Sequence, residues 1–161
     1  MNSTNPLFPD LRIGTATTAE ILPLRMKVLR DGTPSQDPRY PEDDLDITTH
    51  IVARNSNDKI VATSTWLTRP FPDEPGVTGV QLRGMAVDKS LQSKGIGAIV
   101  LAAGIERAFS SGATNVWARA RDAALNFYER NGFTVVGDAF NDEATGMSHH
   151  LVVMRRADGV R

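Results

Sequence analysis

The sequence predicts an α/β (α+β) domain with one mixed central β-sheet of about seven strands, flanked by helices. Seven short stretches have the apolar, β-branched pattern of strands, and three stretches have apolar residues at helical spacing. Their order along the chain is β-α-β-β-β-α-β-α-β-β. Strand–helix–strand connections favour parallel neighbours and hairpins require antiparallel ones, so we expect a sheet of both kinds.

The first half of the chain begins with an alternating strand and a helix. Apolar residues at Ile21 and Leu24 have helical spacing, and Thr18 is the expected N-cap. Pro23 fits the helix only within its first turns or at a kink. The expected elements are a strand at 11–17, a helix at 18–30, a long acidic loop at 31–46, a hairpin at 49–67 and a strand at 77–87.

The second half predicts two more helices, each followed by strand. Gly112 and Gly132 stand where helices end, and Asp122 is the expected N-cap of the shorter helix. The expected elements are a helix from Gly95 to about Ser111, a strand at 114–120, a helix at 122–132 and strands at 133–140 and 147–156.

Length and composition indicate a single domain, which we place at 11–157 behind a flexible segment at 1–10. The chain has 161 residues, 40% of them hydrophobic and 23% charged, and a formal net charge of −1. This balance gives no reason to expect nucleic acid or an anionic membrane as a partner. The N-terminal segment is polar and no apolar run has transmembrane length, so we expect a cytoplasmic protein.

Cysteine is absent from the sequence. This excludes disulfides, thiolate metal sites and a cysteine nucleophile. The spacing of the histidines and acidic residues suggests no metal site either.

The stretch QSKGIGA, residues 92–98, stands where the longest helix begins. The first N–H groups of a helix have no internal acceptor and form an anion site together with the helix dipole. Gly95 and Gly97 would let the backbone approach a phosphate, and Lys94 adds charge. The alternative is a solvent-exposed turn, but two glycines at a helix start, each unfavourable by about 1 kcal/mol, favour the anion site.

Two known phosphate-binding motifs do not match this loop. No Gly-x-x-x-x-Gly-Lys-Ser/Thr string occurs in the chain, and Val100 occupies the third small-residue position of a dinucleotide fingerprint. A plain nucleotide-binding domain is therefore disfavoured.

Two sequence blocks resemble the GCN5-related N-acetyltransferases (GNAT family). The first is Gln-x-x-Gly-x-Gly at Gln92–Gly97, placed between a strand and a long helix, and the second is ARDAALNFYERNGF at 120–133. Each block alone is a weak signal, but both in this order and spacing are specific. The resemblance covers about Gly79 to Gly137, and the first 75 residues match only in the order of elements.

The resemblance implies acetyl-CoA as cosubstrate, held at the end of a bulged strand and by the loop that follows it. The strand at 114–120 would splay from the one before it and admit the cofactor. Tyr128 would lie near the thioester sulfur and act as general acid, although a core tyrosine is the alternative. The cofactor-binding residues it implies, besides Tyr128, are Met85, Ala86, Val87, Gln92, Ser93, Lys94, Gly95, Ile96, Gly97 and Ala98.

Arg121 stands where the family commonly has an asparagine that contacts CoA. An arginine is longer and charged, so it could reach a phosphate of the cofactor or point at the acceptor. The identity of the general base is open as well, because the strand at 77–87 has no acidic residue before Asp88. The candidates are His50, His149, His150 and water, of which His150 is included among the expected catalytic residues.

The expected function is acetyl-CoA-dependent transfer of an acetyl group to a primary amine of a small molecule or peptide, directly in a ternary complex. The alternative is a non-catalytic acyl-CoA-binding regulatory domain. A homodimer is left open. The acidic run Glu42, Asp43, Asp44 and Asp46 either attracts a cationic amine or, more simply, is a solvated loop.

Overall fold

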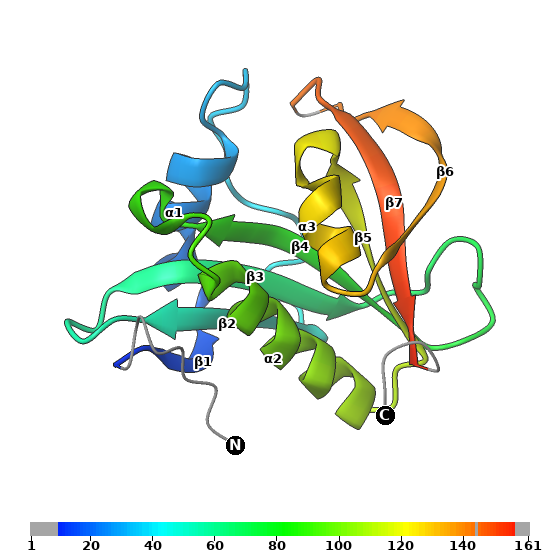
Figure 1. Cartoon of the computed structure of the whole chain (residues 1–161), viewed down its shortest axis with the longest axis horizontal. Helices are drawn as coiled ribbons and strands as arrows, with labels where there is room; N and C mark the ends of the chain where they lie inside the picture. Colours follow the sequence, from blue (N-terminus) through cyan, green and yellow to red (C-terminus); the bar gives the residue numbers. More distant parts are fainter. Residues whose placement is uncertain (1–9, 144, 157–161) are drawn as a thin grey trace.

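The computed structural model describes residues 10–143 and 145–156, which form one seven-stranded sheet with helices on both faces (Figure 1). The strands are β1 Arg12–Ala16, β2 Thr48–Arg54, β3 Ile60–Thr68, β4 Gly79–Val87, β5 Asn115–Arg121, β6 Thr134–Asn141 and β7 Ser148–Arg155. The helices are α1 Thr18–Leu29, α2 Ile96–Ser110 and α3 Leu125–Arg130, with short 3-10 helices η1 Lys89–Leu91 and η2 Asp122–Ala124. The flexible segment predicted at 1–10 lies outside the described residues except for Asp10.

The strand order across the sheet is β1-β2-β3-β4-β5-β7-β6. All neighbours pair antiparallel except β4 and β5, which are parallel and are connected through α2. This confirms the predicted mixed sheet and the predicted order of its elements.

The two long helices cover opposite faces of the sheet, with α1 behind it and α2 in front of it in Figure 1. Adjacent residues of a strand point to opposite faces, and β3 shows both contacts. Thr65 accepts a hydrogen bond from Arg25 of α1, whereas Trp66 packs against Gly104 of α2. The short α3 packs against β6 and β7.

The main hydrophobic core lies between α2 and the sheet. Its largest fully buried members include Leu82, Val100, Leu101 and Val116, and burying such side chains stabilises by about 1.5–3 kcal/mol each. The face covered by α1 is different, since Thr63, Thr65 and Gln81 are buried there. Thr65 accepts from Arg25 and Gln81 accepts from Arg69, so this face carries a polar network, whereas the Thr63 hydroxyl has no hydrogen-bond partner among the described residues.

Both predicted N-caps are wrong. Thr17, not Thr18, caps α1, because its side chain accepts from the backbone of Glu20 while the Glu20 carboxylate accepts from the Thr17 N–H. Thr18 is the first residue of the helix. Asp122 begins η2, and its carboxylate accepts from Ser148 and contacts His150 instead of capping α3.

Within the described residues, no helix is long and apolar enough to cross a membrane.

Replacing Gly104 with alanine should destabilise the fold. A Cβ at this position would lie 1.8 Å from the Trp66 ring, so the ring or α2 must move. We expect a net loss of about 2 kcal/mol despite the better helix propensity of alanine, a typical cost of overpacking. Thermal unfolding should show a lower Tm for Gly104→Ala. The control Gly14→Ala adds a Cβ with no atom within 4 Å and should melt like the parent. Equal Tm values for both variants would contradict this packing.

Candidate active site

The end of β4 is displaced from its neighbour β3 by a bulge. Thr65 pairs with Arg83 and Thr63 with Ala86, so two residues of β4 stand opposite one of β3. Gly84, at the bulge, has φ +61°, in the left-handed region that favours glycine. A bulge leaves its extra residue outside the hydrogen-bond ladder and bends the strand. The bulge expected before the glycine-rich loop is therefore present.

On its other side, β4 separates from β5. The two strands pair from Gly79 with Asn115 to Leu82 with Ala118, and no pairing continues beyond these residues in the described part of the chain. Figure 1 shows β4 and β5 diverging from this point. Residues 83–87 and 119–121 therefore border the diverging part of the sheet, as expected from the predicted splay.

The loop after β4 leads directly into α2, and no side chain caps the N-terminus of this helix. Gly95 is the N-cap residue, with φ +93°, and makes no side-chain cap hydrogen bond. Ser93 has φ +65°, which is uncommon for a residue with a side chain. The Gln92 side chain donates to the carbonyl of Val87 and so ties the loop to the strand end. The first N–H groups of α2 are left available to an anion.

A cavity of about 660 Å³ lies where β4, this loop, α2 and α3 meet. A Cβ on Gly97 would lie 3.4 Å from the side chains of Phe127 and Val87, so a larger side chain there would extend into the space. The lining residues are Val28, Met85, Ala86, Val87, Gln92, Ser93, Gly95, Gly97, Ala98, Ala123, Ala124, Phe127, Arg130 and Asn131. Arg130 is the one charged residue among them.

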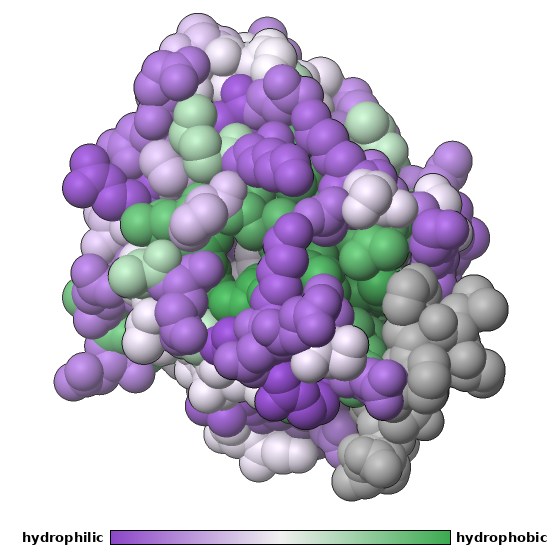
Figure 2. Space-filling model, turned by 90° about the vertical axis from the view of Figure 1, so that its left-hand side faces the viewer, coloured by the Kyte–Doolittle hydropathy of each residue, from purple (hydrophilic) through white to green (hydrophobic). Residues whose placement is uncertain are grey.

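The molecular surface is mostly polar on the side that lies at the left of Figure 1. The space-filling view of this side has hydrophobic surface gathered in a hollow at its centre, surrounded by hydrophilic residues (Figure 2). Apolar surface on this side is thus concentrated in a recess, as in ligand-binding sites of globular proteins.

Eight of the predicted cofactor-binding residues line the 660 Å³ cavity: Met85, Ala86, Val87, Gln92, Ser93, Gly95, Gly97 and Ala98. Lys94 is exposed beside it, and Ile96 is 1% exposed and belongs to the hydrophobic core. A side-chain role for Ile96 is therefore excluded by its burial, although its backbone is part of the helix start. Sequence reasoning missed the wall formed by Ala123, Phe127 and Arg130, which lie within the second sequence block and were identifiable there.

Arg121 does not line this cavity. Its guanidinium donates to the carbonyl of Leu29 at the end of α1, and burial, with Arg30 nearby, lowers the pKa of Arg121. In this arrangement it connects the end of β5 to the end of α1.

Tyr128 is buried in the hydrophobic core on α3. Its ring makes edge contacts with Phe127 and Phe133, at centroid distances of 5.3 Å each. Burial, together with Tyr40 nearby, raises the pKa of the Tyr128 hydroxyl, so it stays protonated at neutral pH. Phe127 lines the 660 Å³ cavity, whereas Tyr128 is not among the residues that line it.

The three histidines lie in different surroundings. His50 is buried, with Nδ1 2.8 Å from Thr65 Oγ1 and Nε2 3.0 Å from Thr18 Oγ1. Both ring nitrogens are therefore engaged in contacts that join β2, β3 and α1. His50 has the environment of a structural residue.

The other two histidines point to opposite faces of β7, as their adjacent positions predict. His149 is 7% exposed, stacks on Phe140 and contacts the Met147 carbonyl through Nδ1. His150 pairs with Asp122, with 2.7 Å between Nδ1 and Oδ1. Neither histidine is among the residues that line the 660 Å³ cavity.

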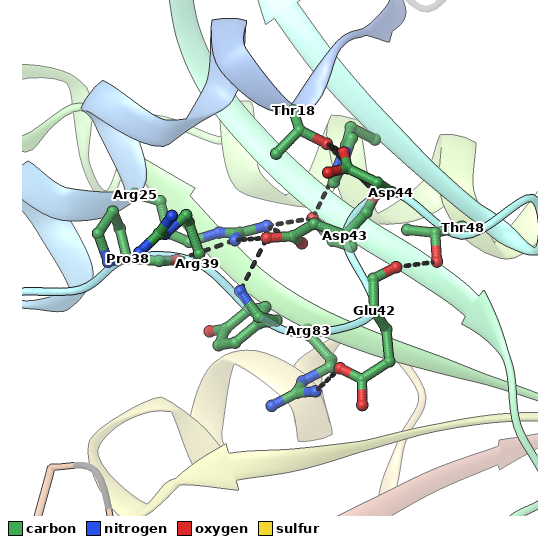
Figure 3. Close-up of polar contacts among 12 residues, drawn as sticks. Thr18, Arg25, Pro38, Arg39, Glu42, Asp43, Asp44, Thr48 and Arg83 are labelled. Atoms are coloured by element: carbon green, nitrogen blue, oxygen red, sulfur yellow. Dashed lines mark hydrogen bonds and ion pairs between the residues drawn. The ribbon is translucent and has the colours of Figure 1, made fainter.

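The acidic run in the 31–46 loop is not simply solvated, contrary to the simpler of the two expectations. Asp43 forms a buried ion pair with Arg25, with 2.8 Å between Oδ2 and Nη1 (Figure 3). Glu42 accepts from both Arg69 and Arg83, at 2.9 and 2.8 Å. These acidic residues hold the loop against α1 and the sheet, which sequence reasoning missed because the partners are far away along the chain.

A second cavity, of about 360 Å³, lies on the other part of β4. The 660 Å³ cavity is lined by β4 residues 85–87, and the 360 Å³ cavity by residues 81–84. Its other walls come from the C-cap residue of α1, the 31–46 loop, β5 and the residue after β6, and include Arg30, Asp37, Arg39, Tyr40, Arg119 and Asp142. The two cavities therefore adjoin along one strand, on either side of the step from Gly84 to Met85.

No cluster of three or more His, Asp or Glu side chains able to hold a metal ion is found among residues 10–143 and 145–156.

Comparison with known proteins gives a consistent result for sequence and structure. The model of the Acetyltransferase (GNAT) family matches residues 19–133, whereas a search of curated proteins gives no match. Among solved structures, Escherichia coli ElaA has a TM-score of 0.73 at 19% identity, covering 90% of this chain and 99% of that one. An acyl-CoA N-acyltransferase from Pseudomonas aeruginosa has a TM-score of 0.72 at 17% identity, covering 89% and 99%.

A third solved structure is FeeM, an N-acyl amino acid synthase from uncultured soil microbes. Its TM-score is 0.70 at 10% identity, covering 90% of each chain. At these identities the three structures establish the fold, and the family model establishes the relationship.

His50 should make the protein less stable in mild acid. Burial lowers the pKa of His50 from 6.5, with Asp43 and Asp44 opposing and Arg25 adding to the effect. The unfolded chain then binds the proton more readily, so His50 favours folding above pH 6.5, and this contribution is lost as the pH falls through its folded pKa. We expect the Tm to fall between pH 7.5 and 5.5, and to fall less in His50→Asn. Equal pH dependence in parent and variant would show that His50 titrates alike in both states.

Proposed function

Because the chain belongs to the acetyltransferase (GNAT) family, we propose that it is an acetyl-CoA-dependent N-acetyltransferase acting on a primary amine of a small molecule or peptide. The observation that carries the proposal is the meeting of three features at one cavity of about 660 Å³: the bulged end of β4, its separation from β5, and the uncapped start of α2.

The residues present fit acyl-CoA. Gly95 and Gly97 keep side chains away from the start of α2, where backbone N–H groups would hold a pyrophosphate. Arg130 on the cavity wall and the exposed Lys94 add positive charge for the phosphates. Met85, Ala86 and Val87 would hold the pantetheine arm through their backbone groups, beside the bulge.

Bound acyl-CoA supplies an acyl group activated as a thioester. The chain's own contribution is to position the acceptor amine next to it and to offer hydrogen bonds from the β4 backbone to the acyl oxygen. The chain has no cysteine, which favours direct transfer in a ternary complex over a thioester on the enzyme. The attacking amine must first lose a proton. Water is our candidate acceptor, because His50 is engaged on both nitrogens and neither His149 nor His150, the histidine expected to be catalytic, lines the 660 Å³ cavity.

One observation favours the alternative of a non-catalytic acyl-CoA-binding regulatory domain. No aspartate, glutamate or histidine is among the residues that line the 660 Å³ cavity, so no side chain there is suited to act as a base. Asp142 and Asp37 lie in the adjoining 360 Å³ cavity. Binding and turnover must therefore be measured separately.

Acetyl-CoA and CoA should raise the Tm of the protein, and NAD should not, because a ligand that binds only the folded form stabilises it. With acetyl-CoA and a panel of primary amines, free CoA thiol should appear at a rate above that of hydrolysis. A thiol reagent detects it without background from this cysteine-free chain. Replacing acetyl-CoA with longer acyl-CoA esters tests the choice of acyl group.

Two variants provide the controls. Gly97→Val should abolish the CoA-induced rise in Tm, because its side chain extends toward Phe127 and Val87. Lys94→Ala, which removes one exposed charge, should reduce it less. Stabilisation by CoA without turnover of any amine would favour the regulatory domain. An unchanged Tm with CoA would refute both proposals.

We propose that Tyr128 is the general acid for the departing thiolate. In Tyr128→Phe the ring and its contacts with Phe127 and Phe133 remain, and no hydrogen bond of the hydroxyl is lost among the described residues. The Tm and CoA binding should therefore change little, whereas kcat should fall by roughly ten- to a thousandfold. A variant with normal kcat would leave Tyr128 as a core residue only.

A further inference from the structure

We infer that the acceptor amine of this enzyme also carries an anionic group, a carboxylate or a phosphate, which the arginine-lined cavity of about 360 Å³ binds. This inference rests on the proposed acyl transfer and specifies its second substrate. The 360 Å³ cavity is lined by β4 residues 81–84, and the next residues of the same strand, 85–87, line the 660 Å³ cavity that we assign to acyl-CoA.

Positive charge is concentrated where β4 and β5 begin to separate. Arg83 and Arg119 are the first residues after the last pair of the two strands, Leu82 with Ala118. Both line the 360 Å³ cavity. They are close enough for the charge of Arg119 to contribute to the lowered pKa of Arg83, of which burial is the main cause.

Arg30 lines the same cavity and is only 7% exposed. Its Nε donates to the backbone carbonyl of Asp37, and its guanidinium lies 5.7 Å from the centre of the Tyr40 ring. The Asp37 carboxyl has a lowered pKa chiefly through Arg39, and the charge of Arg30 contributes. Among the described residues, however, no carboxylate lies within ion-pair distance of Arg30, so an anion in the cavity would supply the direct partner that this buried cation lacks.

The acidic residues nearby neutralise only part of this charge. Glu42 is shared between Arg69 and Arg83, so one carboxylate serves two cations. Asp37 pairs with Arg39 at the exposed rim, and Asp142 lies 3.6 Å from Arg119. A surplus of positive charge therefore remains around Arg30 and Arg83.

The arginine at the strand separation is also held in place. The guanidinium of Arg83 lies 4.0 Å from the centre of the Tyr40 ring, and the same ring contacts Arg25 at 4.3 Å and Arg30 at 5.7 Å. Glu42 fixes Arg83 from a different direction. A guanidinium oriented in advance loses less entropy on binding a carboxylate or phosphate, which it matches with paired donors.

The test compares acceptors that share an amine and differ in the anion. The pairs are L-leucine with L-leucinamide and O-phosphoethanolamine with ethanolamine, each assayed for CoA release from acetyl-CoA. We expect kcat/KM to be at least tenfold higher for the anionic member of one pair, and the pair that shows it identifies carboxylate or phosphate. Equal or better use of both neutral acceptors would overturn the inference and leave acyl transfer standing.

Arg119→Gln should raise KM for the anionic acceptor about tenfold and affect kcat/KM for the neutral partner much less. Its side chain is 46% exposed, so the fold should tolerate the change, and the Tm rise with CoA should persist. Arg12→Gln, which removes a charge on β1 that is 60% exposed and likewise paired with an aspartate, should behave like the parent. Equal losses for anionic and neutral acceptors would contradict anion recognition.

A binding measurement keeps this inference separate from turnover. In the presence of CoA, the anionic compound should raise the Tm of the parent more than its neutral partner does, and Arg30→Gln and Arg119→Gln should each reduce this difference. If no acceptor is acetylated, this difference still decides whether the cavity binds the anion. The absence of any difference in the parent would overturn the inference.

Discussion

The buried ion pair between Arg25 and Asp43 is the contact on which the walls of the 360 Å³ cavity depend. The two side chains are 0% and 4% exposed, and Arg25 also donates to Thr65 and to the Pro38 carbonyl. It thus connects α1, β3 and two points of the 31–46 loop. Removing one member of such a pair leaves a buried charge uncompensated, at a cost of about 3–5 kcal/mol. The contact thus holds the 31–46 loop in place as one wall of the 360 Å³ cavity.

The same contact shapes β4. Asp43 also accepts from the Tyr40 backbone, which places the Tyr40 ring against the bulge. A Cβ on Gly84 would lie 3.0 Å from Arg25 Nε and 3.3 Å from the Tyr40 ring, and the φ of +61° disfavours any side chain there, so glycine is strongly preferred between the helix residue, the loop and the strand. The bulge, the loop and the ion pair are therefore parts of one arrangement, and a change in any of them alters the geometry where the strands separate.

The sequence predicted what depends on local pattern. The order of strands and helices, the glycine-rich start of α2 and the family followed from periodicity and from motifs within about forty residues of each other. Thr17 and Glu20 form a capping box, and their spacing of three residues in the sequence is the pattern that identifies Thr17, not Thr18, as the N-cap. The partners of Asp43, Glu42 and Arg121 could not be predicted from the sequence, because they belong to elements that only the tertiary fold brings together.

The edges of the sheet bear on how this protein behaves at high concentration. The edge strand β1 has only five residues, and Arg12 within it is paired with Asp58. At the opposite edge, β6 leaves its ladder with β7 between Val136 and Phe140, where Gly137 has φ +75°. Short, charged or bulged edges resist the addition of a further strand. Neither edge is therefore a suitable template for sheet extension into aggregates, and any association between copies would have to use other surfaces.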